Sequence, residues 1–517
     1  MTRGRALEAE PPAAPPPAAP AHAASFARDL RLAGAAVLAL LLLTQLYEVW
    51  AGVDFRDLDD LMRTLTARRW AVRPFFMTDG YWLPLPAAMR GAWLRLFSPW
   101  ALQYPALTLF LMRLVTLGGL WGTWRLLADV MLTLGGGRLA VWIFSTFYVF
   151  NLGAFHLAAS NYSEPDAGLW MAAALAVVLR ALTAGGFTRR RLALAGAALA
   201  AACLTRYEPW LSGAALGCAV VLPTARTSRP LDRWAGALIL IPPGAAIAVW
   251  LGVSWLRLGD PFQFLRHAGD YAGSIPPVHP NAAIALTFLQ INAVWMPLAA
   301  VLCGAELVRG RRRPAVRCYA LLLLVSAAWA VHRQSLFPLS IRFFWDVALL
   351  TAAPAALAAE RLARRLPRRT ARLAVGTALV LGMLNHVGAA WRQWPYIPPG
   401  LRDLARGIHA RTAGPILVRD HADWRQVPAL QTFRVCIVTE RLILDEWLTE
   451  EGRVTPEQIR AHGIGYILAR RRPQALADGP PLMEDEESGW ALWRCGGDGG
   501  GGGEENDNVN GNDNSEN

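Results

Sequence analysis

Four aspartates stand within seven residues shortly after the first strongly apolar segment: Asp54, Asp57, Asp59 and Asp60. An aspartate can take a proton as a general base, and the D-x-D spacing of Asp57 and Asp59 can present hard oxygen ligands to a divalent cation. A cluster of this density beside a membrane-length segment indicates a catalytic or ion-binding site. The alternative is structural, with Asp57 as the cap of a helix and Asp60 in its first turn.

The bulk composition predicts a polytopic α-helical membrane protein. Of the 517 residues, 54% are hydrophobic, and the mean hydropathy is +0.27, above that of ordinary soluble chains. The net charge of +12 could indicate nucleic acid binding. The basic residues lie mainly between the apolar blocks, however, as cytoplasmic loops of membrane proteins require. We therefore predict the lipid bilayer, and not nucleic acid, as the partner of this chain.

Apolar blocks of roughly the length that crosses a 30 Å bilayer core recur along the chain, giving about 11 transmembrane helices. The predicted spans are 32–50, 106–128, 138–158, 166–183, 192–206, 208–223, 235–256, 281–307, 317–331, 343–360 and 372–390. Arginines gather in alternate loops, 20 of them in the proposed inner ones. This asymmetry predicts a multi-pass plasma membrane protein with a cytoplasmic N-terminus and an extracytoplasmic C-terminus.

The composition divides the chain further. Residues 1–31 are rich in proline and alanine and are predicted to be a disordered cytoplasmic N-terminus, ahead of a transmembrane domain at 32–390. Residues 391–496 hold short apolar runs around one helical segment, which predicts a small extracytoplasmic α/β domain. Residues 497–517 are mainly glycine, asparagine and acidic residues with almost no apolar side chains, so they are predicted to be a disordered tail.

Residues 51–105, the first outer loop, carry the aspartates. Apolar residues recur there at helical spacing, which predicts two amphipathic helices at the membrane surface. They are Leu58, Leu61, Met62 and Leu65 in one helix, and Met89, Trp93, Leu94 and Phe97 in the other.

The six cysteines show no metal-ligand spacing. Four lie in or beside apolar spans, where a thiol behaves as a small hydrophobe. The other two, Cys436 and Cys495, would lie in a compartment that permits a disulfide, and their pairing stays open.

A series of motifs in this chain resembles the GT-C superfamily of membrane glycosyltransferases, in particular the family 39-like branch of protein O-mannosyltransferases and lipid A aminoarabinose transferases. In that family the first outer loop starts with an acidic pair followed about eight residues later by Ala-Arg. Here Asp59-Asp60 precedes Ala67-Arg68. The series continues with Trp82-Leu83-Pro84-Leu85-Pro86, Arg113-Leu114, Ser163-Glu164-Pro165, Arg206-Tyr207-Glu208 and Gly259-Asp260-Pro261. The resemblance covers roughly residues 32 to 360 and does not extend to the carboxy-terminal domain.

The resemblance implies a transfer of a sugar from a polyprenyl phosphate to an acceptor on the extracytoplasmic face. Such a transfer needs a base for the proton of the acceptor and stabilisation of the departing phosphate. Asp59, the first residue of the pair, is the candidate base, with Asp57 or Asp60 orienting it or binding a metal. On a helix Asp57 and Asp60 would share a face that Asp59 does not. A divalent cation stays open, with Asp57 and Asp59 as its ligands if one is used.

Two candidate substrate-binding residues lie near the outer ends of the predicted spans. Glu164 matches a second acidic position of the family, which implies contact with acceptor or sugar. An ionisable group there is costly and tends to be functional, although a first-turn carboxylate beside Pro165 is also an ordinary helix start. Arg113 is the second candidate, because the Arg113-Leu114 motif belongs to the series that resembles the GT-C superfamily. Asp166 and Asp260 are interpreted as ordinary loop or interface residues.

Arginines are the candidate ligands of the donor phosphate. Arg206 and Glu208 interrupt an otherwise apolar run, so they either pair with each other or leave Arg206 to bind phosphate, which suits the guanidinium geometry. Arg342 is an equal candidate, and Arg333 and His332 are its rivals.

Two other classes of function stay open at this level. One is a secondary transporter or lipid flippase whose intramembrane arginine and glutamate form a substrate pathway; it predicts hydropathy repeats, which are not evident. The other is a non-enzymatic cell-envelope assembly scaffold, for which aspartate to asparagine substitutions would be silent. The sugar, and whether the acceptor is a protein, lipid or glycan, are not indicated.

Overall fold

A computed structural model of the chain divides it into two compact units, residues 1–394 and 395–517. The described residues are 20–50, 58–76, 82–98, 100–103, 105–150, 160–184, 186–224, 230–266, 295–336, 345–367, 414–418, 442–444, 454–469, 477–486 and 489–495, with scattered positions between 151 and 159 and between 369 and 412.

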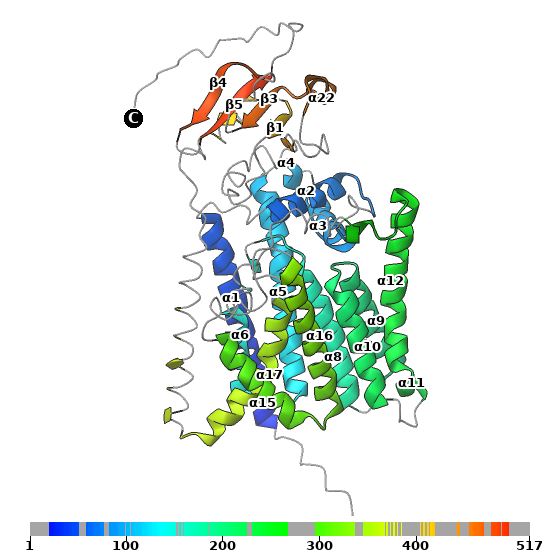
Figure 1. Ribbon diagram of the computed structural model, residues 1–517. Coiled ribbons are helices and arrows are strands. Elements are labelled where there is room, and N and C mark those ends of the chain that lie inside the picture. Colours follow the sequence, from blue (N-terminus) through cyan, green and yellow to red (C-terminus); the bar gives the residue numbers. More distant parts are fainter. Residues whose placement is uncertain are drawn as a thin grey trace, which may run out of the picture. The chain divides into compact units, whose positions relative to one another are not determined.

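The first unit is helical (Figure 1). Its helices are α1 (Pro20–Trp50), α2 (Leu58–Val72), α3 (Pro84–Leu96), α4 (Trp100–Gln103), α5 (Pro105–Thr133), α6 (Arg138–Val149), α8 (Glu164–Thr183), α9 (Arg189–Cys203), α10 (Glu208–Thr224), α11 (Pro230–Arg233), α12 (Ala235–Leu258), α15 (Trp295–Gly310), α16 (Pro314–Leu336) and α17 (Trp345–Arg365).

Long apolar helices build this unit, as a membrane protein requires. Among the described residues, five helices are long and apolar enough to cross a bilayer, namely α1, α5, α8, α12 and α16. The helices α6, α9, α10, α15 and α17 overlap five further predicted spans, and the last predicted span, 372–390, lies mostly outside the described residues. Helix α1 begins at Pro20, so it includes residues 20 to 31, which the sequence assigned to the disordered N-terminus. Alanine is frequent in that stretch and favours a helix.

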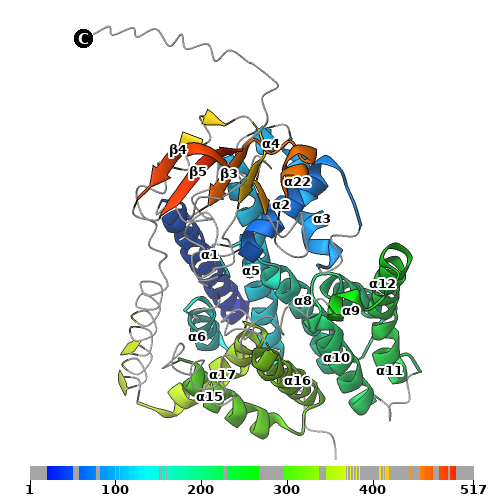
Figure 2. The same ribbon diagram turned by 45° about the horizontal axis from the view of Figure 1, so that its top comes forward.

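Neighbouring helices approach closely through glycines. Helices α9, α10 and α12 pack together (Figure 2). A Cβ atom on Gly217 of α10 would lie 2.6 Å from Leu240 of α12, and one on Gly236 of α12 would lie 2.6 Å from the carbonyl oxygen of Gly217. At Gly236 the facing atom is backbone, so only a hydrogen atom fits, whereas at Gly217 the Leu240 side chain would have to move. Small residues let membrane helices approach in this way.

Buried polar side chains also join the helices. The Gln45 amide of α1 donates to the carbonyl oxygens of Arg113 (2.9 Å) and Ala158 (2.8 Å). Glu360 of α17 accepts a hydrogen bond from the backbone amide of Gly137 (2.8 Å), the residue before α6. The first amides of a helix have no partner within the helix, so Glu360 satisfies one of them.

The first loop folds into the two helices predicted for it, α2 and α3, with the short α4 after them. A buried apolar cluster that includes Ala67, Leu94 and Met112 joins α2, α3 and α5. The buried Arg68 donates to Thr108 Oγ1 (3.2 Å) and to the carbonyl oxygen of Leu102 (3.0 Å). The Ala-Arg motif therefore anchors the loop in this structure.

The second unit contains a five-stranded mixed sheet of order β2-β1-β3-β5-β4. Its strands are β1 (Ile416–Val418), β2 (Leu442–Leu444), β3 (Tyr466–Ala469), β4 (Ala477–Asp485) and β5 (Trp490–Cys495). Strand β1 pairs in parallel with β2 and β3, whereas β5 is antiparallel to β3 and β4. Helix α22 (Pro456–Ala461) starts at a capping box formed by Thr455 and Gln458.

Candidate functional site

The acidic pair lies in the first turn of α2, where its two members have different surroundings. Asp60 is completely buried, and its Oδ1 accepts from the backbone amide of Asn161 (2.7 Å). The Asn161 side-chain amide in turn donates to Thr64 Oγ1 (3.0 Å). Asp59 is partly exposed and lies 3.5 Å from the Arg63 guanidinium one turn later. Asp60 therefore fixes α2 to the chain before α8, while Asp59 is the more accessible carboxylate. Asp57 lies outside the described residues.

A buried ion pair ties α3 to α8. Arg90 and Asp166 are each only 1% exposed, and Arg90 also donates to the carbonyl oxygen of Tyr162 (2.8 Å) and to Thr116 Oγ1 (3.3 Å). A buried charge is tolerated when it is paired and hydrogen-bonded in this way. Asp166 is thus a structural link between helices, consistent with its interpretation as an interface residue.

A small cavity lies between α2, α3 and the segment before α8. Its lining includes Arg63, Trp82, Arg90 and Asn161. The Arg63 guanidinium lies 5.0 Å from the ring centre of Trp82, within the range of a cation–π contact. The side chain paired with Asp59 therefore forms one wall of a pocket next to the candidate base.

Three predicted substrate-binding residues come together in a second cluster. Arg206 Nη1 lies 2.8 Å from Glu164 Oε1. Its Nη2 and Nε donate to the two carboxylate oxygens of Glu208, at 2.6 and 3.1 Å. Its Nη1 also donates to Ser163 Oγ (3.2 Å). Arg333 forms a further ion pair with Glu208. Of the sequence interpretations, the one in which Arg206 pairs with Glu208 matches these contacts.

The helix termini explain why carboxylates collect here. Glu164, Glu208 and Asp346 each lie in the first turn of a helix, in α8, α10 and α17 respectively, and all three line one pocket. The positive end of each helix dipole stabilises a carboxylate in its first turn. Arg333, in the last turn of α16, lies at the end of a helix where a cation is favoured.

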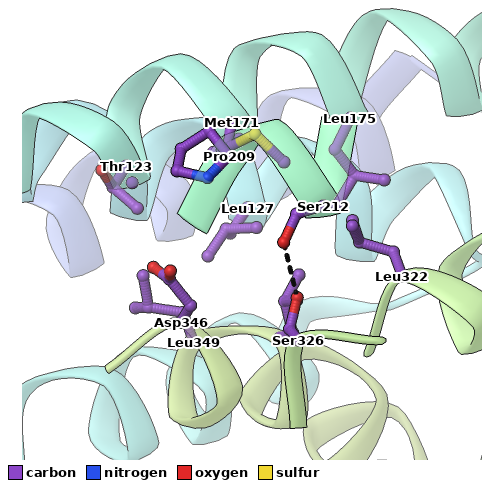
Figure 3. A pocket seen from close by; sticks show the side chains of 13 residues that line it. Thr123, Leu127, Met171, Leu175, Pro209, Ser212, Leu322, Ser326, Asp346 and Leu349 are labelled. Carbon is purple, nitrogen blue, oxygen red and sulfur yellow. Dashed lines mark hydrogen bonds between the residues drawn. The ribbon is translucent and has the colours of Figure 1, made fainter. Parts of the chain in front are cut away.

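A mainly apolar cavity adjoins this charged pocket (Figure 3). Asp346, Ser212 and Ser326 line both of them, and the two serine hydroxyls lie 3.3 Å apart. The apolar side chains labelled there are Leu127, Met171, Leu175, Pro209, Leu322 and Leu349. Sequence reasoning missed Asp346, although an ionisable residue inside the predicted span 343–360 was a usable signal.

The remaining predicted residues stand apart from these pockets or outside the described parts. Arg113 is buried in α5 and does not line either the charged pocket or the cavity of Figure 3. Arg342 lies outside the described residues. Within the parts of the chain that the structure describes, no group of three His, Cys, Asp or Glu side chains is arranged to hold a metal ion.

The Gly259-Asp260-Pro261 motif has a local structural role. Gly259 ends α12 in the left-handed conformation that glycine adopts readily. The Phe262 amide donates to Asp260 (2.9 Å), and Arg266 pairs with the same carboxylate. The Phe262 hydrogen bond and then the Arg266 guanidinium lower the pKa of Asp260, against an opposing effect of partial burial.

Three helices, α2, α3 and the short α4, follow the first long helix α1 and precede the second, α5. The comparison with solved structures finds the same overall fold in membrane glycosyltransferases. The chain is similar to ArnT from Cupriavidus metallidurans bound to undecaprenyl phosphate, with a TM-score of 0.58 and 13% identity over 89% of this chain and 97% of that one. It is also similar to the oligosaccharyltransferase AglB from Archaeoglobus fulgidus in complex with an inhibitory peptide and a dolichol-phosphate, with a TM-score of 0.53 and 11% identity over 86% of this chain and 69% of that one.

Both neighbours are GT-C superfamily glycosyltransferases, so the predicted GT-C fold is confirmed. No family model matches the chain, and no curated protein matches it in sequence. At 11 to 13% identity the similarity establishes the fold alone.

Proposed function

We propose that this protein is a glycosyltransferase that moves a sugar from a polyprenyl-phosphate-linked donor to an acceptor on the extracytoplasmic side of the plasma membrane. Asp59 is the proposed base. It takes the proton of the acceptor hydroxyl while the acceptor oxygen attacks the anomeric carbon, and the bond from that carbon to the phosphate oxygen breaks. The lipid phosphate leaves with the electron pair of the broken bond.

The observation that carries this proposal is the division of roles within the acidic pair. Asp60 is buried and accepts from the Asn161 amide, whereas Asp59 is partly exposed beside a pocket lined by Arg63 and Trp82. A base must reach its substrate, so accessibility favours Asp59. The fold adds support, because a solved structure of ArnT holds undecaprenyl phosphate and one of AglB holds a dolichol-phosphate.

For the donor phosphate we favour Arg342. Arg206 contacts Glu164 and Glu208, so its guanidinium already neutralises carboxylates. Arg342 was its equal in the sequence and stands in the connection between α16 and α17. Substitution Arg342→Gln should raise the KM for the lipid-linked donor, whereas Arg206→Gln should lower the stability of the bundle. If instead Arg206→Gln raised the KM and Arg342→Gln did not, Arg206 would be the ligand of the donor phosphate.

The central test is sugar transfer from a radiolabelled polyprenyl-phosphate hexose by membranes that carry matched amounts of each variant. Asp59→Asn should lower turnover by about 100-fold or more, the usual contribution of a general base. Asp129→Asn is the control, because Asp129 pairs with Arg125 and Arg180 near the far end of α5. Equal turnover by wild type and Asp59→Asn would remove Asp59 from the chemistry. Absence of turnover in all of them would contradict the proposed donor and favour a transporter.

A further inference from the structure

Asp346 lies where the charged pocket meets the apolar cavity of Figure 3, toward which its carboxylate points. Among the residues that the structure describes, no side chain forms a hydrogen bond or ion pair with Asp346. The two arginines that line the same pocket contact Glu164 and Glu208 instead. Among the described residues this half-buried carboxylate therefore has no hydrogen-bond donor, although the charges of Arg206 and Arg333 act on it. A ligand or water that enters the pocket can supply the donor.

Trp329 presents the complementary group. It lines the charged pocket, and its indole Nε1 is buried without a hydrogen-bond partner in the described part of the chain. Ser326, Trp329, Ala330 and Arg333 recur at i, i+3, i+4 and i+7 along α16, so they share one face of this helix. Ser326, Trp329 and Arg333 thus bring polar groups to one face of an otherwise apolar span, where such groups tend to be functional.

The polar groups that line this pocket, from α10, α16 and α17, define the chemistry of a ligand. A carboxylate accepts hydrogen bonds, an indole N–H donates one, and the hydroxyls of Ser212 and Ser326 can do either. The Trp329 ring adds an apolar face of the kind that covers C–H groups. A ligand that matches these groups carries several closely spaced hydroxyls on a compact ring with an apolar face.

We propose that Asp346, Trp329, Ser212 and Ser326 form a monosaccharide-binding subsite. Asp346 accepts from two adjacent sugar hydroxyls, Trp329 Nε1 donates to a ring or hydroxyl oxygen, and the serine pair completes the contacts. The subsite rests on the proposed function, in which the sugar belongs either to the lipid-linked donor or to the acceptor. It assigns a role to Asp346 and Trp329 independently of the identity of the base.

The test is protection of a cysteine placed in the subsite. Ser326→Cys is made in a full-length chain in which Cys218, exposed on α10, is the one native cysteine retained. The rate of modification by methyl methanethiosulfonate is followed by intact mass, with Cys218 as the internal control. The probes are methyl hexosides, a polyprenyl-phosphate hexose, bare polyprenyl phosphate, and betaine at matched osmolarity.

At least one hexoside, or the lipid-linked hexose, should slow modification of the Ser326→Cys thiol about 5-fold or more and leave Cys218 unaffected. Protection by the lipid-linked hexose alone assigns the subsite to the donor sugar, and protection by free hexosides alone assigns it to the acceptor. Asp346→Asn should abolish the protection, because a hydrogen bond to a charged group contributes about 10-fold or more to affinity. Trp329→Phe should weaken the protection while keeping the ring.

Four results would overturn the subsite: no modification of the Ser326→Cys thiol at all, no protection by any sugar, full protection in Asp346→Asn, or equal protection by bare polyprenyl phosphate. Failure of the proposed function is distinguishable from these. Sugar protection without any transfer would leave a sugar-binding pocket in a protein with another activity, whereas active transfer without protection would reject the subsite alone.

Discussion

Arg90 of α3 and Asp166 of α8 form an ion pair in which both side chains are almost fully buried. Together with the bond from the Asn161 amide to Asp60, it connects the first-loop helices to both ends of the short segment 161–166. Glu164 lies within that segment. The distance between the proposed base and the charged pocket is therefore set by two buried links and not by a mobile loop.

Breaking the first link should destabilise the protein strongly. Arg90→Met leaves the Asp166 carboxylate buried without its cation, which typically costs about 3–5 kcal/mol of unfolding free energy. The double variant Arg90→Met/Asp166→Leu removes both charges and should recover much of the loss. Thermal unfolding of the purified full chain in detergent measures both effects.

The matched control for this pair is Arg180→Met, because Arg180 pairs with Asp129 but is 52% exposed. Exposed pairs contribute about 0–1 kcal/mol, so this variant should unfold close to the wild-type temperature. If Arg90→Met lost no more stability than Arg180→Met, the Arg90–Asp166 pair would not hold the loop in place.

Stability and activity should separate within the acidic pair. Asp60→Ala leaves the buried Asn161 amide without its acceptor, and an unsatisfied buried group costs about 1–3 kcal/mol. Asp59→Ala removes a partly exposed side chain and should change the unfolding free energy by about 0.5 kcal/mol or less. Unfolding temperatures measured beside sugar transfer would check this, and a larger stability loss for Asp59→Ala would contradict the assigned roles.

Two glycines of one helix should respond oppositely to alanine. A Cβ on Gly236 would lie 2.6 Å from the backbone oxygen of Gly217, so Gly236→Ala must separate α10 from α12 at a cost of about 1–3 kcal/mol. Gly244, also in α12, has nothing within 4 Å of such an atom, and Gly244→Ala should gain about 0.5–1 kcal/mol through helix propensity. Unfolding midpoints of the two variants provide the comparison, and equal shifts would show that α10 and α12 are not in close contact.

The helices were largely predictable from the sequence because a segment that crosses a bilayer must satisfy its backbone hydrogen bonds internally, as a helix does. Such a helix appears in the sequence as a long apolar block. Ten of the described helices overlap ten predicted spans. The start of α1 was less predictable, because the proline- and alanine-rich composition of residues 1–31 indicated a disordered lead. In the structure Asp29 pairs with Arg138 of α6, and Arg31 donates to the carbonyl oxygen of Ala27 (3.3 Å), so charges occur inside the helix.

The site was predictable only where residues are close in sequence. Arg206 and Glu208 interrupt one apolar run, and an ion pair between them was one of the two interpretations that the sequence allowed. The burial of Asp60 depends on Asn161, 101 positions away, and the pocket beside Glu164 depends on Asp346 and Trp329 from α17 and α16. Neither hydropathy nor spacing specifies which distant helix ends meet, because packing of the whole bundle decides it.

A proline inside α17 leaves one backbone oxygen without its helical donor. Pro354 has no backbone N–H, so the carbonyl oxygen of Leu350, four residues earlier, lacks its helical donor. The buried Tyr319 hydroxyl of α16 donates to that oxygen (2.5 Å). Tyr319→Phe should therefore cost about 1–3 kcal/mol by leaving a buried acceptor unpaired. In a Pro354→Ala background residue 354 supplies its own N–H, and the same substitution should cost clearly less. A double-mutant cycle on unfolding free energies measures this coupling, and purely additive effects would show that Tyr319 does not compensate for Pro354.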